Sequence, residues 1–167
     1  RGYVPGLLQL RRPVRRITLA LGGDLKNAPA LAMGADVYLA PFIGDLEDPL
    51  TQEDFQRQVH RMLELYGVRP EVLVHDLHPE YHSTRWASGF PAEHKASVQH
   101  HHAHTVSCMV DNGVSSPVIG VSLDGTGYGA DGNLGGGEFL VADYQGFRRV
   151  GHLEYLPLPG GTIAIKK

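Results

Sequence analysis

One sequence pattern occurs twice in this chain: a short apolar strand that runs directly into a glycine-rich loop. Residues 17–21, Ile-Thr-Leu-Ala-Leu, end at Gly22 and Gly23, and residues 118–123 end at the longer run Asp124-Gly-Thr-Gly-Tyr-Gly. Short apolar stretches bounded by turn residues are typical of buried strands, so each copy predicts a strand that enters a tight turn. The repeat favours a duplicated architecture in which each copy begins with such a strand.

The segments between and after the two copies have the periods of an α/β fold. Apolar stretches at 17–21, 30–33 and 36–40 predict a three-stranded meander. A capping-box pattern at 51–54, with Asp in place of the usual Glu, opens a run at helical spacing that ends at Gly67. The other expected elements are a strand at 71–75, a short helix opened by Pro79 and running toward Ala87, a strand near 96–99, a helix ended by Gly113, and strands at 118–123, 138–143 and 147–154.

This order of elements resembles the plan of the ATPase fold shared by actin, sugar kinases and heat-shock chaperones. That fold is a ribonuclease H-like α/β fold with a phosphate loop in the first hairpin of each lobe. We therefore expect a first lobe over 17–113 and a partial second lobe, the opening strands only, over 118–167. Residues 1–16 contain the one basic cluster, at 11–16, and are expected to form a solvated leader segment. No helix is expected after the second set of strands, so one face of that sheet should be bare.

Composition and charge narrow the class of protein. The chain has 167 residues, of which 42% are hydrophobic and 20% are charged, as is ordinary for a folded domain. A formal net charge of -3 and dispersed cations give no footprint for nucleic acid or an anionic membrane, and no apolar run approaches the roughly 20 residues that span a bilayer. A single cysteine, Cys108, and the lack of a signal-peptide pattern predict a cytoplasmic location.

Four of the ten histidines fall within one segment, Val-Gln-His-His-His-Ala-His at 98–104. His100 and His104 are four residues apart, so on a helix both imidazoles face the same way and can hold one metal ion. His101 and His102 point elsewhere. Such a pair needs further ligands, and oxygen ligands with open positions would suit iron, zinc or manganese. The alternative is a polar, partly solvated helix start, and the spacing within the cluster favours the metal.

The first glycine loop supplies open backbone amides and two polar side chains. Gly22 and Gly23 follow the buried strand, while Lys26 and Asn27 add a cation and an amide, which is the chemistry of a phosphate cradle. The spacing and the missing Lys-Ser or Lys-Thr exclude a P-loop. A plain hairpin turn explains the segment equally well.

The second loop, 124–132, is longer and contains more glycine. Its glycines let backbone approach an anionic ligand, and Asp124 is placed at the end of a strand like a metal-binding or catalytic carboxylate. The alternatives are a long flexible hairpin or a calcium loop built on Asp124 and Asp131. An EF-hand is excluded because its third, fifth and twelfth positions hold unsuitable residue types. The repeated pattern also predicts that the loops at 22–27 and 124–129 face each other across one cleft.

Taken in order, six segments resemble the landmarks of one protein family: LGGDLKN, HDLHPEYHSTRWA, VQHHHAH, LDGTGYGADG, GGEFL and LPLPGG. They are similar to those of the C-terminal domain of HypF-type [NiFe]-hydrogenase maturation factors, which are related to the TsaD and TobZ-type carbamoyltransferases. VQHHHAH together with DGTGYGADG makes the resemblance specific, and it covers nearly the whole chain from Gly2 onward.

The resemblance implies part of a carbamoyltransferase that depends on ATP and carbamoyl phosphate. Carbamoyl adenylate would be the donor, and the C-terminal cysteine of a HypE-like acceptor protein would receive the carbamoyl group on the way to the hydrogenase cyanide ligands. Cys108 would have no part in transfer, because the acceptor thiol belongs to the partner. We expect this chain alone to be inactive, because the rest of the second lobe is missing. Two alternatives stay open: an ATP-dependent kinase or hydrolase of the same fold, and a non-enzymatic metal or nucleotide binding module.

The resemblance also implies roles for individual residues. His100 and His104 match the family's metal ligands, and Asp124 matches the carboxylate that joins them and serves catalysis. Iron or zinc would be the divalent metal, acting as a Lewis acid on the carbamoyl oxygen or the phosphate. The first phosphate loop would comprise Gly22, Gly23, Lys26 and Asn27. The phosphate region of the adenylate would be met by Gly125, Thr126 and Gly127.

Overall fold

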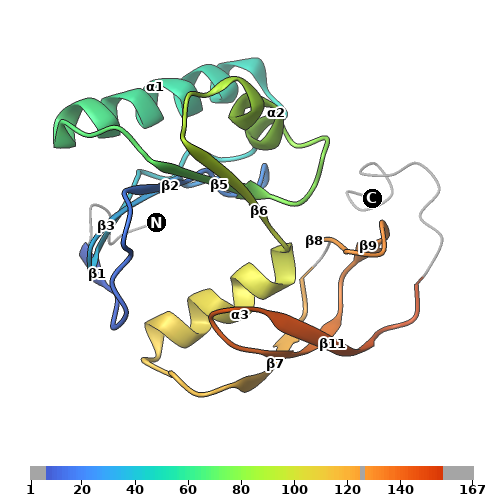
Figure 1. Cartoon of the computed structure of the whole chain (residues 1–167). Coiled ribbons are helices and arrows are strands. Elements are labelled where there is room, and N and C mark those ends of the chain that lie inside the picture. Colours follow the sequence, from blue (N-terminus) through green and yellow to red (C-terminus); the bar gives the residue numbers. More distant parts are fainter. Residues whose placement is uncertain (1–6, 125–126, 156–167) are drawn as a thin grey trace.

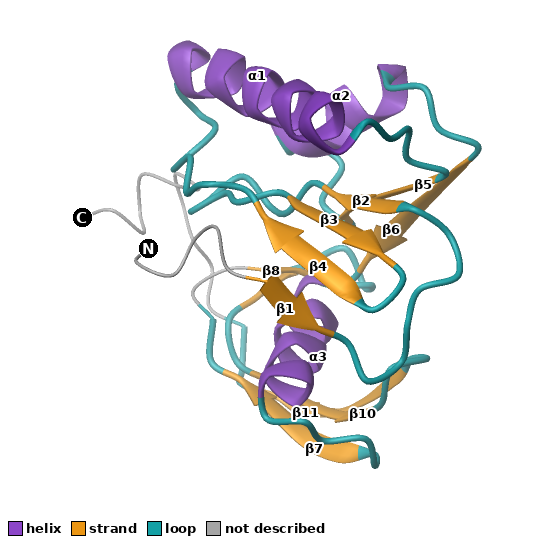
Figure 2. Cartoon of the chain, turned by 90° about the vertical axis from the view of Figure 1, so that its left-hand side faces the viewer, coloured by secondary structure: helices purple, strands orange, loops and turns teal. Residues whose placement is uncertain are grey.

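A computed structural model describes residues 7–124 and 127–155 of the chain (Figure 1). In chain order the elements of this part are β1 (Leu7–Gln9), β2 (Thr18–Ala20), β3 (Ala30–Met33), β4 (Asp36–Leu39), α1 (Pro49–Tyr66), β5 (Val72–Asp76), α2 (His82–Gly89), β6 (His94–Val98), α3 (His100–Asp111), β7 (Val118–Ser122), β8 (Gly127–Tyr128), β9 (Leu134–Gly135), β10 (Glu138–Ala142) and β11 (Phe147–His152). They are stacked as α1 and α2, a six-stranded sheet, α3, and a three-stranded sheet (Figures 1 and 2). Among the helices described, none is both long and apolar enough to cross a bilayer.

The six-stranded sheet has the order β1-β4-β3-β2-β5-β6. β2, β3 and β4 form the predicted antiparallel meander, and β5 and β6 run parallel to β2. Leu19 on β2 lies between Leu31 on β3 and Leu73 on β5, and all three side chains are fully buried. Phe55 and Val59 on α1 belong to the same buried cluster. A meander followed by parallel strands is the first lobe of the ribonuclease H-like fold that the sequence predicts.

β1 extends this sheet with residues that the sequence assigned to a leader segment. Leu7 pairs with Tyr38 on β4, in antiparallel register. Farther along, the Arg11 guanidinium lies against Gly113, where an added Cβ would be 2.5 Å from it. Residues 7–9 therefore form part of the sheet. Three residues are too few to show a strand period, so only the pairing with β4 identifies them as a strand.

α1 begins two residues before the predicted capping box at 51–54. Asp48 is the N-cap residue, its carboxylate accepts a hydrogen bond from the backbone N–H of Leu50 at 2.7 Å, and Pro49 occupies the first turn. Gly67 ends the helix at φ 61°, as predicted. The capping-box interpretation was wrong because a nearer Asp-Pro pair already satisfies the first turn.

The three-stranded sheet has the order β11-β10-β7 and is the predicted second antiparallel meander. α3 covers one of its faces: a Cβ added at Gly120 on β7 would lie 2.5 Å from Oγ1 of Thr105 on α3. The opposite face is apolar and exposed at Ile119, Val121 and Leu123, which keep 74%, 54% and 74% of their surface. A helix that precedes the three-stranded sheet in the chain, and follows the last strand of the six-stranded sheet, therefore covers one face of it.

Candidate metal and phosphate site

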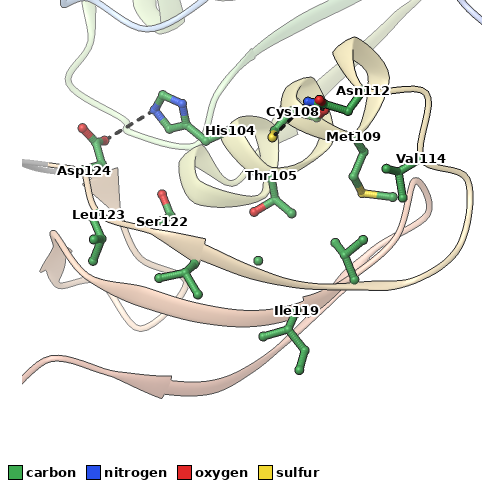
Figure 3. Close-up of a pocket in the computed structure, with 13 residues that line it drawn as sticks. His104, Thr105, Cys108, Met109, Asn112, Val114, Ile119, Ser122, Leu123 and Asp124 are labelled. Atoms are coloured by element: carbon green, nitrogen blue, oxygen red, sulfur yellow. Dashed lines mark hydrogen bonds and ion pairs between the residues drawn. The ribbon is translucent and has the colours of Figure 1, made fainter.

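Three potential metal ligands converge between α3 and the end of β7. His100 and His104 lie one turn apart on α3, and Asp124 is the second residue after β7. The His100 Nε2 atom lies 2.8 Å from Asp124 Oδ2 and 3.2 Å from His104 Nε2. The His104 Nε2 atom lies 3.6 Å from Asp124 Oδ2, and Figure 3 shows this pair. Within residues 7–124 and 127–155, no other three His, Cys, Asp or Glu side chains bring ligand atoms as close together. The predicted ligand set is thus brought together in the fold.

A buried carboxylate on β5 orients the first of these histidines. Asp76 Oδ2 lies 2.6 Å from His100 Nδ1, and its Oδ1 accepts a hydrogen bond from the His78 backbone N–H at 2.8 Å. The hydrogen bond to Asp76 raises the pKa of His100, although partial burial opposes the shift. Because Nδ1 faces Asp76, Nε2 faces Asp124, which is the carboxylate–histidine arrangement found behind many metal ligands. Asp76 was not predicted, because the sequence marks it only as a carboxylate at the end of an apolar strand.

The first glycine loop is shaped from inside by Asn27. This side chain is 2% exposed, and its Nδ2 donates hydrogen bonds to the backbone oxygens of Leu21 and Gly23 at 2.8 and 2.6 Å. Gly22 has a φ of 73°, a conformation that favours glycine. Lys26 is exposed and is the one non-glycine residue with positive φ in the described part. Asn27 therefore holds the loop in shape, while Lys26 is accessible to a ligand.

Asp24, in the same loop, caps α2 across a long sequence separation. Its carboxylate accepts hydrogen bonds from the backbone N–H groups of His82 and Ser83, at 2.6 and 3.1 Å. Free N–H groups at a helix start require such acceptors. α2 consequently begins at His82 and not directly after Pro79, as the sequence had predicted, because the cap comes from a residue that local sequence does not reveal.

Both glycine loops approach the imidazole ring of His100. A Cβ added at Gly23 would lie 3.6 Å from His100 Cε1, and one added at Gly127 would lie 3.0 Å from His100 Cδ2. The two loops thus lie beside the same imidazole ring, one near Cε1 and the other near Cδ2. That they face each other across one cleft stays a prediction. Gly125 and Thr126, also predicted to meet phosphate, lie outside the described residues.

Negative charge gathers around the site. Tyr81 stacks on His78 with ring centroids 4.2 Å apart, and Tyr128 lies 5.0 Å from the same imidazole. Burial, together with the carboxylates of Asp76, Asp24 and Asp124, raises the pKa of Tyr81 to about 12. The phenol therefore stays neutral at physiological pH, and the surrounding carboxylates favour a cation.

A cavity of about 650 Å³ extends from the ligands along the groove between α3 and β7 (Figure 3). His104 and Asp124 stand at one end, and Met109 and Val114 line the other. The ligand cluster is therefore open on the side of His104, which keeps 55% of its side-chain surface.

Comparison with known proteins identifies the family. The family model described as the HypF Kae1-like domain matches residues 14–111, more than half of the chain. The chain belongs to the HypF family. A second model, described as the second subdomain of the carbamoyltransferase Kae1-like domain, matches residues 120–167. The histidine pair thus lies within the first match, and Asp124 within the second.

Relatives in the HypF family match the chain along its whole length. Carbamoyltransferase HypF2 of Cupriavidus necator is 40% identical over 173 residues, which cover 100% of this chain and 21% of that protein. Carbamoyltransferase HypF of Synechocystis sp. is 38% identical, with 99% and 22% covered. The chain is similar to the crystal structure of a full-length HypF in its phosphate- and nucleotide-bound form, with a TM-score of 0.94 and 42% sequence identity. It is also similar to the crystal structure of T. kodakarensis HypF, with a TM-score of 0.86 and 34% identity. Each match covers 99% of this chain and 22% of the other chain. The chain spans about a fifth of the length of these relatives.

Proposed function

We propose that this chain carries part of a carbamoyltransferase site, which passes a carbamoyl group from carbamoyl adenylate to the C-terminal cysteine of a HypE-like acceptor protein. Membership in the HypF family supports the reaction, since relatives of that family are named carbamoyltransferases. The observation that carries the proposal is the convergence of His100, His104 and Asp124 beside two glycine loops.

The three ligands fit a divalent metal, with iron or zinc as the proposed ion. Two imidazole nitrogens and one carboxylate oxygen lie within 4.8 Å of one another, and this mixed nitrogen and oxygen set suits either ion. Asp76 supplies the outer hydrogen bond that such histidine ligands usually have. When bound, the metal would polarise the carbamoyl or a phosphate oxygen.

The chain's own residues would position the donor for attack. In the proposed step the acceptor thiolate forms a C–S bond with the carbamoyl carbon, and the bond from that carbon to the phosphate oxygen breaks, so that AMP leaves. Asp124 is the proposed catalytic carboxylate because it joins the histidine pair to the second glycine loop. Gly23 and Gly127 let the backbone of both loops lie close to the ring of His100, where a Cβ at Gly127 would be only 3.0 Å from it.

The phosphates of ATP or of the adenylate are proposed to meet the two glycine loops. One relative was crystallised in a phosphate- and nucleotide-bound form. In this chain Gly22, Gly23 and Lys26 are proposed as contacts, with Asn27 as the residue that keeps their loop in shape. Gly125, Thr126 and Gly127 complete the proposed phosphate contacts.

Metal analysis and ligand preference together test this function. Simultaneous His100→Ala and His104→Ala substitution should abolish zinc or iron binding in elemental analysis, whereas His94→Ala, on an exposed strand away from the cluster, should retain it. Calorimetry should show tighter binding of a non-hydrolysable carbamoyl adenylate analogue than of ATP. Unchanged metal content in the double variant would remove the metal assignment, and turnover of ATP to ADP without carbamoyl phosphate would favour a kinase or hydrolase.

Transfer itself is tested with carbamoyl adenylate and a HypE-like acceptor. We expect the 167-residue chain by itself to leave the acceptor's terminal cysteine unmodified in mass spectrometry, because it spans about a fifth of its relatives. A thiocarbamate formed at the rate of a full-length relative would show that the described residues already complete the site.

A further inference from the structure

His101 lies between the two histidine ligands in sequence but points into the other side of the site. Its side chain is fully buried. The ring Nε2 donates a hydrogen bond to the backbone oxygen of Gly135 on β9 at 3.1 Å, and Nδ1 accepts one from Gln99 Nε2 at 2.8 Å. Both ring nitrogens are therefore used within the protein, and neither is available to a ligand.

Gln99 extends this connection to the other strand of the β8–β9 hairpin. Its Oε1 accepts a hydrogen bond from the His102 backbone N–H at 2.8 Å, which caps the start of α3. Its Nε2 donates a hydrogen bond to the backbone oxygen of Tyr128 on β8 at 3.3 Å, in addition to the one to His101 Nδ1. Gln99 and His101 thus bond the first turn of α3 to both strands of the hairpin.

Gly127, the first residue of β8, rests directly on this ring. A Cβ added at Gly127 would lie 2.6 Å from both Cε1 and Nε2 of His101, closer than real contacts allow. Asp124 lies three residues before Gly127 and two residues after Ser122, the last residue of β7. Ser122 pairs with Glu138 on β10. The segment that carries Asp124 is therefore fixed at one end by the sheet and at the other by His101.

We propose that His101 is a positioning residue for the metal site: it holds the Asp124 segment on α3, so that this carboxylate stays in reach of His100 and His104. The inference rests on the proposed metal-binding function. Its physical basis is that the three ligands come from two segments of chain, and His101 joins these segments at a point beside the ligands.

The neighbouring His102 provides a matched control. Its Nε2 donates a hydrogen bond to the backbone oxygen of Asp143 at 2.8 Å, and its ring packs on Phe147 with centroids 5.1 Å apart. His102 therefore also joins α3 to the second sheet through one backbone hydrogen bond. Asp143 follows the last residue of β10, whereas Asp124 lies near the first residue of that strand, Glu138. The His102 contact is therefore at the end of β10 that is farther from Asp124.

The test compares Co²⁺ binding by the 167-residue chain in three variants. His101→Leu should weaken Co²⁺ affinity by about tenfold or more and alter the visible absorption of the bound ion, since loss of supporting hydrogen bonds commonly has that effect. His101→Gln, whose amide can still donate to Gly135, should recover most of the affinity. His102→Leu should lower the melting temperature to a similar degree but leave the affinity and the spectrum unchanged.

The outcomes separate this inference from the function on which it rests. Wild-type affinity in a folded His101→Leu protein, or equal loss in His102→Leu, would overturn the positioning role while the metal site stands. If the wild-type chain binds no Co²⁺ at all, both the proposed metal site and the positioning role of His101 are wrong. Should His101→Leu not fold, His101→Asn decides, because its shorter amide cannot reach the backbone oxygen of Gly135 as glutamine can: lower affinity than in His101→Gln supports the role, and equal affinity overturns it.

Discussion

The two sheets of this molecule are covered in different ways. The core of the six-stranded sheet comes from its own part of the chain: Leu19, Leu31 and Leu73 pack beneath α1, and every fully buried member of this cluster lies between residues 17 and 92. The three-stranded sheet buries Leu140 and Ala142 on the side of α3 and exposes an apolar row on the other. The first half thus has a core of its own, whereas the second depends on a helix that precedes it in the chain.

This difference explains where the candidate site is placed. α3 follows β6 at the edge of the first sheet and packs against the second, so its first turn stands where the two halves meet (Figure 1). His100 receives Asp76 from the first half and Asp124 from the second. The geometry of a ligand set divided in this way depends on how the two halves are held together, while most of the buried apolar side chains lie in the first.

The comparison predicts that the largest loss of stability follows from a cavity in the first core. Phe55 is fully buried and packs edge-on against Trp86, with ring centroids 5.2 Å apart. Phe55→Ala should lower the free energy of unfolding by about 3–5 kcal/mol. Leu140→Ala, in the second sheet, should lower it by about 2 kcal/mol, because a sheet with one open face can relax around the cavity. Chemical denaturation measures both, and a larger effect at Leu140 would reverse the comparison.

A smaller loss is predicted where α3 touches the second sheet. Gly120→Ala places a methyl group against Thr105 and should destabilise the protein by about 1–3 kcal/mol, the usual range for overpacking. Thr105→Ala in the same protein removes the two closest atoms and should restore part of that stability. Gly146→Ala is the control, since a Cβ there meets nothing within 4 Å. Equal melting temperatures for the Gly120 and Gly146 variants would show that the backbones are not in close contact.

The contribution of the first half to the site is tested through Asp76. Asp76→Asn keeps the acceptor for the His78 backbone N–H but removes the charge beside His100. We expect metal affinity to fall by about 10-fold to 100-fold, as for other outer partners of histidine ligands, with little change in melting temperature. Asp54→Asn, on the exposed side of α1, serves as the control in the same titration. Unaltered affinity would show that the first half does not support the ligands.

Local patterns in the sequence predicted the parts that local physics determines. Apolar runs that stop at glycine located both meanders, and the four-residue spacing of His100 and His104 predicted which two imidazoles converge. The same reasoning could not find β1, β8 and β9, because two or three residues have no period and exist as strands only through pairing. It also missed Asp24 and Asp76, whose partners lie 58 and 24 residues away.

The smallest predicted effect is a pH dependence confined to the second half, at a network around Arg149. Hydrogen bonds from the Tyr155 hydroxyl, at 2.8 Å, and from the Asn133 backbone lower the pKa of Asp131 below its ordinary value, and Arg149 also bonds to this carboxylate at 2.8 Å. A carboxylate whose pKa is lower in the folded state stabilises the fold above its unfolded pKa of about 3.9. That contribution is lost as pH falls toward the lower folded value.

The size of the effect follows from exposure. Asp131 keeps 36% of its side-chain surface, so solvent screens the interaction and the expected stabilisation is only about 0.5 kcal/mol. Asp131→Asn should therefore unfold slightly more easily than the wild type at pH 6, and the difference should narrow as the pH falls below about 3.9, when both are measured by denaturant titration. Asp111→Asn, at the exposed end of α3, should show no such convergence. A gap for Asp131→Asn that persists unchanged at pH 3 would mean that its side chain acts through shape and not through charge, and the second half would then have no acid-sensitive contact at this hairpin.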